Sequence, residues 1–132
     1  MNILIIEDEL LIQKSLKKLL EKRGATVKTF ASGRDAIKDI LKNNYDRIVC
    51  DLMLKDITGF DIIEESKKKY QLKEIAQIFI IMTAYNSPQV LAKAKEYHCT
   101  ILNKPFENLE FALNAMLNIS NTKAIHEQHE TN

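Results

Sequence analysis

Short hydrophobic runs alternate with longer stretches of helical periodicity along this chain of 132 residues. The hydrophobic runs cover residues 2–6, 25–30, 47–51, 78–82 and 100–103, and the chain is expected to re-enter the sheet for the fourth of them at about residue 76. Helical segments are predicted at about 9–22, 33–43, 59–70, from residue 88 onward, and at about 107–118. Five alternations of this kind predict an α/β fold with a doubly wound parallel sheet.

The first and last predicted helices each have a recognisable apolar face. On the first helix this face comprises Ile12, Leu16, Leu19 and Leu20, and Gly24 supplies the left-handed residue that ends the helix. The last helix is expected to bury Leu109, Leu113, Met116 and Leu117. No apolar period continues beyond it, so we predict one domain at residues 1–118 and a mobile polar tail at 119–132.

The composition excludes several classes of protein. With 45% hydrophobic residues the chain can form a layered core, and a net charge of +1 provides no basic surface for nucleic acid or an anionic membrane. No apolar stretch approaches a membrane span, and no basic leader precedes the first strand. We therefore expect a cytoplasmic protein that binds neither DNA nor membranes directly. Cys50 and Cys99 lack metal-ligand spacing and are expected to be buried and reduced.

Polar residues follow four of the predicted strands at the point where each strand ends. Glu7 and Asp8 follow the first, Asp51 ends the third, Thr83 follows the fourth and Lys104 follows the fifth. Parallel strands place their carboxyl ends at one edge of the sheet, which is where open α/β sheets carry their sites. We therefore expect three carboxylates, a hydroxyl and an ammonium to meet at this edge.

Three carboxylates in one place need a compensating cation, because like charges repel and Lys104 can neutralise only one of them. Mg²⁺ suits oxygen ligands and retains several bound waters. A metal with open positions beside an ammonium and a hydroxyl can receive a phosphoryl group, with Asp51 as the nucleophile. Taken alone, Glu7 and Asp8 could equally be helix N-terminal charges, and Thr83 a strand-end cap. The ordered set as a whole favours the functional interpretation.

Residues 1–118 resemble the receiver domain of two-component response regulators. The resemblance rests on Glu7-Asp8, Asp51, Thr83-Ala84 and Lys104-Pro105-Phe106, together with a segment at residues 51–59 that is similar to the family's phosphoacceptor loop. It implies a flavodoxin-like fold, (βα)5, with strand order 2-1-3-4-5. It also implies a cis peptide bond before Pro105.

The resemblance also implies a role for each site residue. Asp51 would accept a phosphoryl group from the phosphohistidine of a sensor histidine kinase or a histidine phosphotransfer protein. Mg²⁺ would be bound by Asp8, Asp51 and the backbone carbonyl of Met53, with Glu7 holding a metal-bound water. Thr83 would donate a hydrogen bond to a phosphoryl oxygen, and Lys104 would pair with Asp51 and then with the phosphate. Such a domain catalyses only the transfer of a phosphoryl group to itself and its own dephosphorylation, and it is not otherwise an enzyme.

The chain departs from the family pattern at three positions. Lys55 stands where the family usually has proline, which leaves the loop after Asp51 less restricted in φ. Ile101 replaces the usual Tyr or Phe that moves inward on activation, so switching would depend mainly on Thr83. Glu7 replaces the commoner Asp and keeps the charge.

The output and partners remain open at this stage. A stand-alone, chemotaxis-type receiver that switches binding of an effector protein is expected, as a monomer or a weak phosphorylation-dependent dimer; a receiver cut from a longer regulator is the alternative. On the first helix, an exposed Leu11 is a candidate contact for the phosphodonor. Other functions fit less well. An aspartyl-phosphate phosphatase would need a second acid where Met53 stands, a degenerate receiver would not need the full polar set, and a flavin protein would need a Ser/Thr/Gly-rich loop after the first strand.

Overall fold

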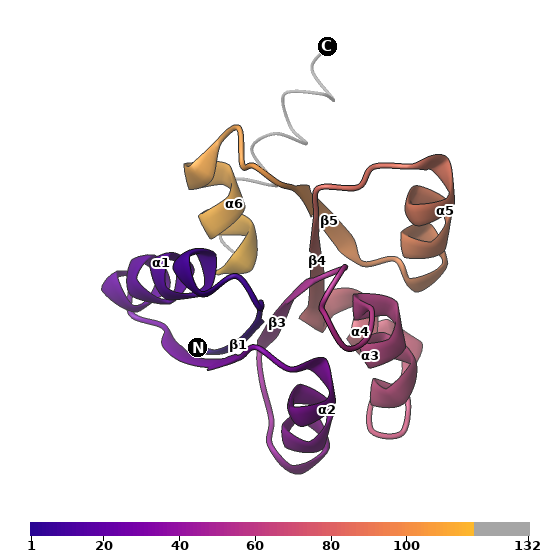
Figure 1. The fold of residues 1–132 in the computed structure, drawn as a ribbon. Helices are drawn as coiled ribbons and strands as arrows, with labels where there is room; N and C mark the ends of the chain where they lie inside the picture. The colour runs from indigo at the N-terminus through magenta and orange to yellow at the C-terminus, as the bar shows by residue number, and fades with distance from the viewer. Residues whose placement is uncertain (118–132) are drawn as a thin grey trace, which may run out of the picture.

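The computed structural model describes residues 1–117, in which five strands and six helices follow one another along the chain (Figure 1). The predicted tail at 119–132 lies outside these residues, and the boundary at 118 stays a prediction. The strands are β1 (Asn2–Ile6), β2 (Thr26–Phe30), β3 (Arg47–Asp51), β4 (Phe79–Thr83) and β5 (Thr100–Asn103). The helices are α1 (Leu10–Lys22), α2 (Gly33–Lys42), α3 (Gly59–Ser66), α4 (Leu72–Ile78), α5 (Pro88–Tyr97) and α6 (Leu109–Met116).

All neighbouring strands pair in parallel, in the order β2-β1-β3-β4-β5. This confirms the predicted doubly wound sheet and its strand order. In the centre of the sheet Ile5 pairs with Val49, and Val49 pairs with Ile80. Because every strand runs in the same direction, the carboxyl ends of β1, β3, β4 and β5 lie along one edge.

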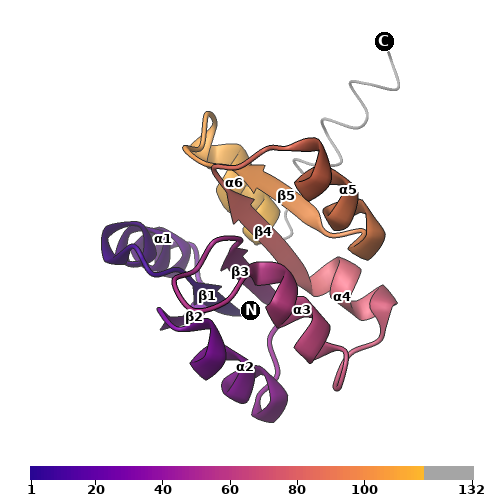
Figure 2. The ribbon, with the colours of Figure 1, turned by 45° about the vertical axis from the view of Figure 1, so that its right-hand side comes forward.

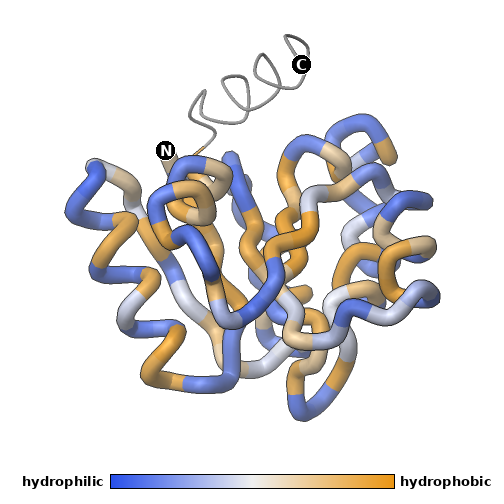
Figure 3. Tube along the Cα trace, turned by 90° about the horizontal axis from the view of Figure 1, so that it is seen from above, coloured by the Kyte–Doolittle hydropathy of each residue, from blue (hydrophilic) through white to orange (hydrophobic). Residues whose placement is uncertain are grey.

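Helices cover both faces of the sheet (Figure 2). Along β1 the side chains alternate: Ile3 and Ile5 pack with α1 and α6, whereas Leu4 and Ile6 pack with α2, α3, α4 and α5. Figure 3 shows hydrophobic and hydrophilic residues alternating along the outer helices, as expected for elements with one buried face. Strands enclosed on both faces explain the nearly continuous apolar runs of the sequence. Among residues 1–117, none of the helices combines the length and hydrophobicity that crossing a membrane requires.

The predicted helix ends are mostly confirmed. Gly24 has φ +93° and ends α1 in the left-handed region, where an L side chain would be strained. Ser32 caps α2 and Ser87 caps α5, each accepting a hydrogen bond from a backbone N–H three residues on. Thr58 and Asp61 form a capping box at the start of α3.

The prediction that the chain re-enters the sheet at about residue 76 is wrong. Residues 72–78 form a sixth helix, α4, in whose first turn the carboxylate of Glu74 accepts a hydrogen bond from the N–H of Gln71. This helix runs into β4 at Phe79 without an intervening loop. The apolar residues Ile75 and Ile78 of the helix lead directly into those of the strand. The sequence therefore contains no signal for the change from helix to strand.

The third helix was predicted to extend to about residue 70, but α3 ends at Ser66. The Ser66 hydroxyl donates to the carbonyl of Ile62 within the last turn. In the following turn Lys69 donates to the carbonyls of Ile40 and Asn43 at the end of α2. The lysine run after α3 thus contributes a cap to a neighbouring helix.

Several burial predictions need correction. Leu109, expected to be buried, is 42% exposed at the first position of α6, and Leu117, also expected to be buried, is only partly buried after the end of that helix. Ile12 and Leu19 of α1 are only partly buried, although Leu16 and Leu20 are fully enclosed. Both cysteines are free, but only Cys50 is buried; Cys99 is half-buried.

Candidate functional site

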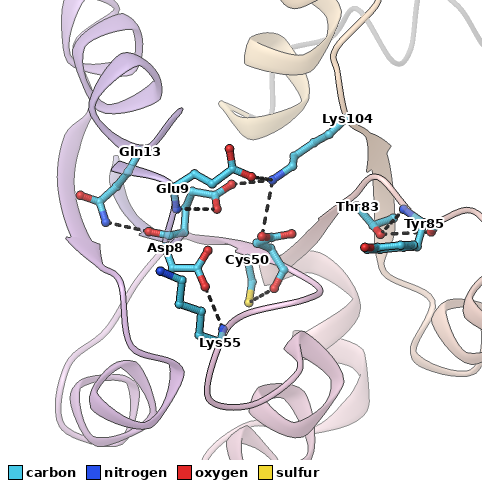
Figure 4. Close-up of polar contacts among 10 residues, drawn as sticks. Asp8, Glu9, Gln13, Cys50, Lys55, Thr83, Tyr85 and Lys104 are labelled. Atoms are coloured by element: carbon cyan, nitrogen blue, oxygen red, sulfur yellow. Dashed lines mark hydrogen bonds and ion pairs between the residues drawn. The ribbon is translucent and has the colours of Figure 1, made fainter. Parts of the chain in front are cut away.

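The loops that follow β1, β3, β4 and β5 bring the predicted polar residues to one edge of the sheet (Figure 4). Carboxylate oxygens of Glu7, Asp8 and Asp51 lie within 4.8 Å of one another. Glu7 is fully buried and Asp51 is 6% exposed, whereas Asp8 is half-buried. The three carboxylates predicted to meet therefore do so, in a partly enclosed position.

Lys104 provides the ammonium at this cluster. Its Nζ lies 2.7 Å from Oε1 of Glu7 and 3.4 Å from Oδ2 of Asp51. The exposed carboxylate of Glu9, which sequence reasoning did not include, lies 4.0 Å from the same ammonium. The resemblance implied pairing of Lys104 with Asp51, but the shorter contact is with Glu7.

The electrostatic balance of the cluster is visible in two pKa values. Burial, together with the negative charge of Glu7, raises the pKa of Asp51 to about 6, against the opposing effect of Lys104. Burial also acts to lower the pKa of Lys104, but the hydrogen bond to Glu7 and the charges of Asp51 and Glu7 outweigh it, so this pKa is raised. Lys104 therefore stays charged, whereas ionisation of Asp51 is made less favourable by its surroundings.

The donor set fits a hard divalent cation. One ammonium leaves three carboxylates with an excess of negative charge, and carboxylate oxygens are the ligands that Mg²⁺ prefers. Met53, whose backbone carbonyl was predicted as a further ligand, lies two residues after Asp51 and forms an isolated bridge with Thr58. Its side chain points outward, since the residue is 51% exposed.

Hydrogen bonds from neighbouring groups hold two of the carboxylate residues. The buried side chain of Gln13 donates to the backbone carbonyl of Glu7 at 2.9 Å, which fixes the turn between β1 and α1. The backbone N–H of Lys55 donates to Oδ2 of Asp8 at 2.8 Å. Sequence reasoning missed both donors: Gln13 could have been suspected from its place beside Ile12 on the inner side of α1, but no sequence signal marks a backbone N–H.

Thr83 ends β4 and is 1% exposed. Its hydroxyl donates to the carbonyl of Tyr85 at 3.0 Å and accepts from the N–H of Tyr85 at 2.8 Å. Figure 4 shows Thr83 and Tyr85 to one side of Lys104, on the neighbouring loop. In this structure the hydroxyl is thus engaged by its own loop.

The loop after β5 carries the expected cis peptide bond between Lys104 and Pro105, which confirms that prediction. The N–H of Lys104 donates to the carbonyl of Thr83 at 2.8 Å and joins this loop to the end of β4. Ile101, which stands in place of the usual aromatic residue, is half-buried in β5.

An apolar hollow of about 340 Å³ lies next to the site, between α1 and the start of α6. Leu11, Ile12, Pro105, Phe106 and Leu109 are among the residues that line it, together with Lys104 from the site itself. Leu11 is 82% exposed, as expected. Its role as a contact for the phosphodonor stays a prediction.

Comparison with known proteins gives a consistent result. The family described as the response regulator receiver domain matches residues 3–115. The transcriptional regulatory protein QseB of Escherichia coli O157:H7 is 32% identical in an alignment 139 positions long, which covers 100% of this chain and 60% of QseB. The response regulator SaeR of Staphylococcus aureus (strain USA300) is 29% identical over 130 residues, 96% of this chain and 54% of SaeR. The chain therefore spans little more than half the length of these relatives.

Several solved structures with a sequence identity of 25% or more share this fold. The non-phosphorylated HemR receiver domain from Leptospira biflexa is 29% identical, with a TM-score of 0.78 and coverage of 89% of this chain and 91% of that one. The chemotaxis protein CheY4 of Vibrio cholerae is 25% identical, with a TM-score of 0.76 and coverage of 89% and 97%.

Proposed function

The chain belongs to the response regulator receiver domain family, which acts in two-component signalling, and on that basis we propose that Asp51 accepts a phosphoryl group from a phosphohistidine. One observation carries the proposal: Asp51 lies in a cluster with Glu7 and Asp8, and 3.4 Å from the ammonium of Lys104. A nucleophile, an acidic ion site and a positive charge are the parts that phosphoryl transfer requires. A receiver domain is a signalling module and not a classical enzyme.

In the proposed step an ionised oxygen of Asp51 attacks the phosphorus atom as the bond from phosphorus to the donor's imidazole nitrogen breaks. The product is an acyl phosphate on Asp51. The ammonium of Lys104 moves from its contact with Glu7 toward the new phosphoryl oxygens, a small shift because it already lies near both carboxylates. Positive charge held at that point stabilises the charge that develops on the phosphoryl group.

Glu7, Asp8 and Asp51 are proposed to hold Mg²⁺, with the backbone carbonyl of Met53 as a further ligand and Glu7 acting through a bound water. The excess negative charge of the cluster supports this assignment. When bound, the ion would neutralise phosphoryl oxygens and the surrounding carboxylates. The protein's own contribution is to keep the carboxylates together in a partly buried position, where Asp51 is otherwise held at a raised pKa.

Thr83 is proposed to report the phosphorylated state. Its hydroxyl would leave the backbone of Tyr85 and donate to a phosphoryl oxygen, which would shift the loop that leads into α5. The affected surface would be α5 and β5, because both adjoin Thr83 and Lys104. Ile101 in β5 has no ring to rotate, so the motion of this loop would carry the signal.

The partners are proposed by class. Membership in the family implies a histidine kinase as the phosphodonor, directly or through a phosphotransfer protein, and an effector protein as the receiver of the signal. Regulation of transcription, named for QseB, belongs to a protein of which this chain covers 60%. A cytoplasmic location, consistent with two free cysteines, and a monomer or weak phosphorylation-dependent dimer complete the proposal.

The test is to incubate the protein with Mg²⁺ and a small acyl phosphate, then locate any HPO₃ adduct by mass spectrometry of peptides. We expect one adduct, on Asp51, that disappears when Mg²⁺ is removed. The control variant Asp51→Asn preserves the size of the side chain but cannot form an acyl phosphate. Modification of that variant at the same rate, or an adduct elsewhere in the wild type, would contradict the proposal.

A further inference from the structure

The backbone N–H of Lys55 points at the carboxylate of Asp8, although the two residues are 47 positions apart. The bond is 2.8 Å long and connects the turn after β1 with the loop after β3. A proline at position 55 could not form this hydrogen bond, because proline has no N–H to donate.

The loop around Lys55 is anchored on both sides. Leu54 is 8% exposed and packs in the core beneath α2 and α3. Asp56 accepts hydrogen bonds at 3.0–3.1 Å from the hydroxyl of Ser32 and from the N–H groups of Gly33 and Arg34, at the start of α2. Asp56 also accepts a hydrogen bond from the N–H of Ile57, which makes four in all. The N–H of Lys55 is therefore held in place between the buried Leu54 and the hydrogen-bonded carboxylate of Asp56.

The start of α2 is fitted closely to this loop. A Cβ atom on Gly33 would lie 2.6 Å from Cγ1 of Ile57, nearer than any normal carbon contact. Glycine at that position lets the loop approach the helix closely enough for Asp56 to reach the first N–H groups. The loop after Asp51 is thus fixed by contacts, even though Lys55 leaves its φ less restricted than proline would.

We infer that the N–H of Lys55 is a positioning group for Asp8, which sets the distance between Asp8 and Asp51 before Mg²⁺ arrives. The inference rests on the proposed function, since it assigns a role to Asp8 as a metal ligand. One oxygen of Asp8 accepts the N–H, and the carboxylate retains lone pairs for a cation. Hydrogen bonds that orient ligating carboxylates typically change metal affinity by about 10-fold to 100-fold when they are removed.

The test compares Lys55→Pro, which deletes the N–H, with Lys55→Ala, which removes the same side chain but keeps the N–H. Mg²⁺ affinity is measured by calorimetry on the unphosphorylated proteins, so that the readout does not depend on phosphoryl transfer. We expect Lys55→Ala to bind like the wild type and Lys55→Pro to bind about tenfold or more weakly. Equal affinities of the two variants would overturn the inference.

A second comparison separates positioning of Asp8 from general damage to the loop. In an Asp8→Ala background the same two variants should bind Mg²⁺ equally, because the N–H has no carboxylate to orient. A gap that persists in that background would show that proline acts through the loop itself and would also overturn the inference.

If Lys55→Pro does not fold, replacing the amide between residues 54 and 55 by an ester removes the same N–H without fixing φ, and the same two outcomes apply. Failure of the proposed function would look different, since the wild type itself would then not bind Mg²⁺. Binding by the wild type with no difference between the variants would overturn the inference alone.

Discussion

Lys104 donates a 2.7 Å hydrogen bond to the buried carboxylate of Glu7. Glutamate extends one methylene further than aspartate, and this reach allows the carboxylate to meet the ammonium while its backbone stays at the end of β1. Lys104 lies 3.4 Å from Asp51 at the same time. The ammonium therefore occupies the same negative region that would attract a metal ion.

From this contact we predict opposite effects of Lys104→Met on two measurements. Mg²⁺ should bind more tightly, because a competing positive charge is removed from the three carboxylates. Phosphorylation by a small acyl phosphate should be at least about tenfold slower at saturating Mg²⁺, since about 1.4 kcal/mol of lost transition-state stabilisation suffices. Lys73→Met, on the exposed surface of α4, is the control and should change neither. Weaker Mg²⁺ binding by Lys104→Met would contradict the prediction.

The raised pKa of Asp51 predicts how stability depends on pH without metal. In the unfolded chain the carboxyl titrates near 3.8, and in the folded protein at about 6. Below about pH 4 the carboxyl of Asp51 is protonated in both states and does not reduce the free energy of unfolding. Between about pH 4 and 6 the carboxyl is still protonated in the folded state but ionised in the unfolded state, so the free energy of unfolding falls as pH rises. Above about pH 6 the loss of stability is complete.

Asp51→Asn removes that ionisation. In the presence of a chelator its free energy of unfolding should exceed that of the wild type at pH 8 by about 3 kcal/mol, since the pKa is raised by about two units and each unit corresponds to about 1.4 kcal/mol. At pH 3.5 the difference should vanish. Urea unfolding at both pH values measures it, and a gain of equal size at both would mean that packing, not charge, is responsible.

Much of this site could be predicted because it depends on where strands end. Glu7, Asp51 and Thr83 each follow a hydrophobic run, and a parallel sheet brings such positions to one edge whatever the details of packing. The buried faces follow from the hydrophobic periodicity, whereas the strand order was implied by the resemblance to receiver domains. Residues such as Leu16 and Leu20 were identified because helical spacing alone places them on the core side.

Other features depend on information that residue types do not carry. The preference of Lys104 for Glu7 is the difference between contacts of 2.7 Å and 3.4 Å, which is smaller than the length of one covalent bond. The donor to Asp8 is a backbone N–H, which nearly every residue possesses, so Lys55 was noted in the sequence for replacing proline but not as a hydrogen-bond donor. The extra helix α4 was missed because its apolar residues run directly into β4.

The hydrogen bonds of Thr83 lead to a prediction about switching. Because the hydroxyl is held by the backbone of Tyr85, phosphorylation should release it and shift the loop that leads into α5. We expect a beryllofluoride mimic of the phosphoryl group to shift amide resonances over residues 84–103 in the wild type. Thr83→Ala should lose most of these shifts, whereas Thr83→Ser, which keeps a hydroxyl, should retain them. Full and identical shifts in the alanine variant would exclude a role for Thr83.

The residue that caps the C-terminus of α5 offers a test of local backbone strain. His98 adopts the left-handed conformation, with φ +56°, where a side chain is unfavourable. His98→Gly should raise the free energy of unfolding by about 0.5–1 kcal/mol. Gly24→Ala is the opposite change, which places a side chain on a residue with φ +93°. Because no atom lies within 4 Å of the added Cβ, this change should lower the free energy of unfolding through backbone strain alone. Stabilisation by both changes, measured by urea unfolding, would contradict this account.

Met53 and Tyr85 predict that the phosphorylated form is long-lived for a receiver. Hydrolysis needs a water in line with the acyl phosphate, and these residues, two positions after Asp51 and Thr83, flank that approach in the family. The thioether of Met53 accepts hydrogen bonds only weakly and positions water poorly. Tyr85 is 61% exposed on the loop that Thr83 holds, so its ring can cover the path when that loop moves.

Replacing either residue by a polar group that can hold water should therefore accelerate loss of the phosphoryl group. Met53→Asn and Tyr85→Glu should each decay about tenfold faster, because aligning one water need lower the barrier by only about 1.4 kcal/mol. Met53→Leu and Tyr85→Phe are matched controls that keep the apolar bulk and should decay like the wild type. The rates are read from the decay of labelled phosphoprotein after the donor is removed. A polar variant that decays more slowly than the wild type would disprove shielding at its position.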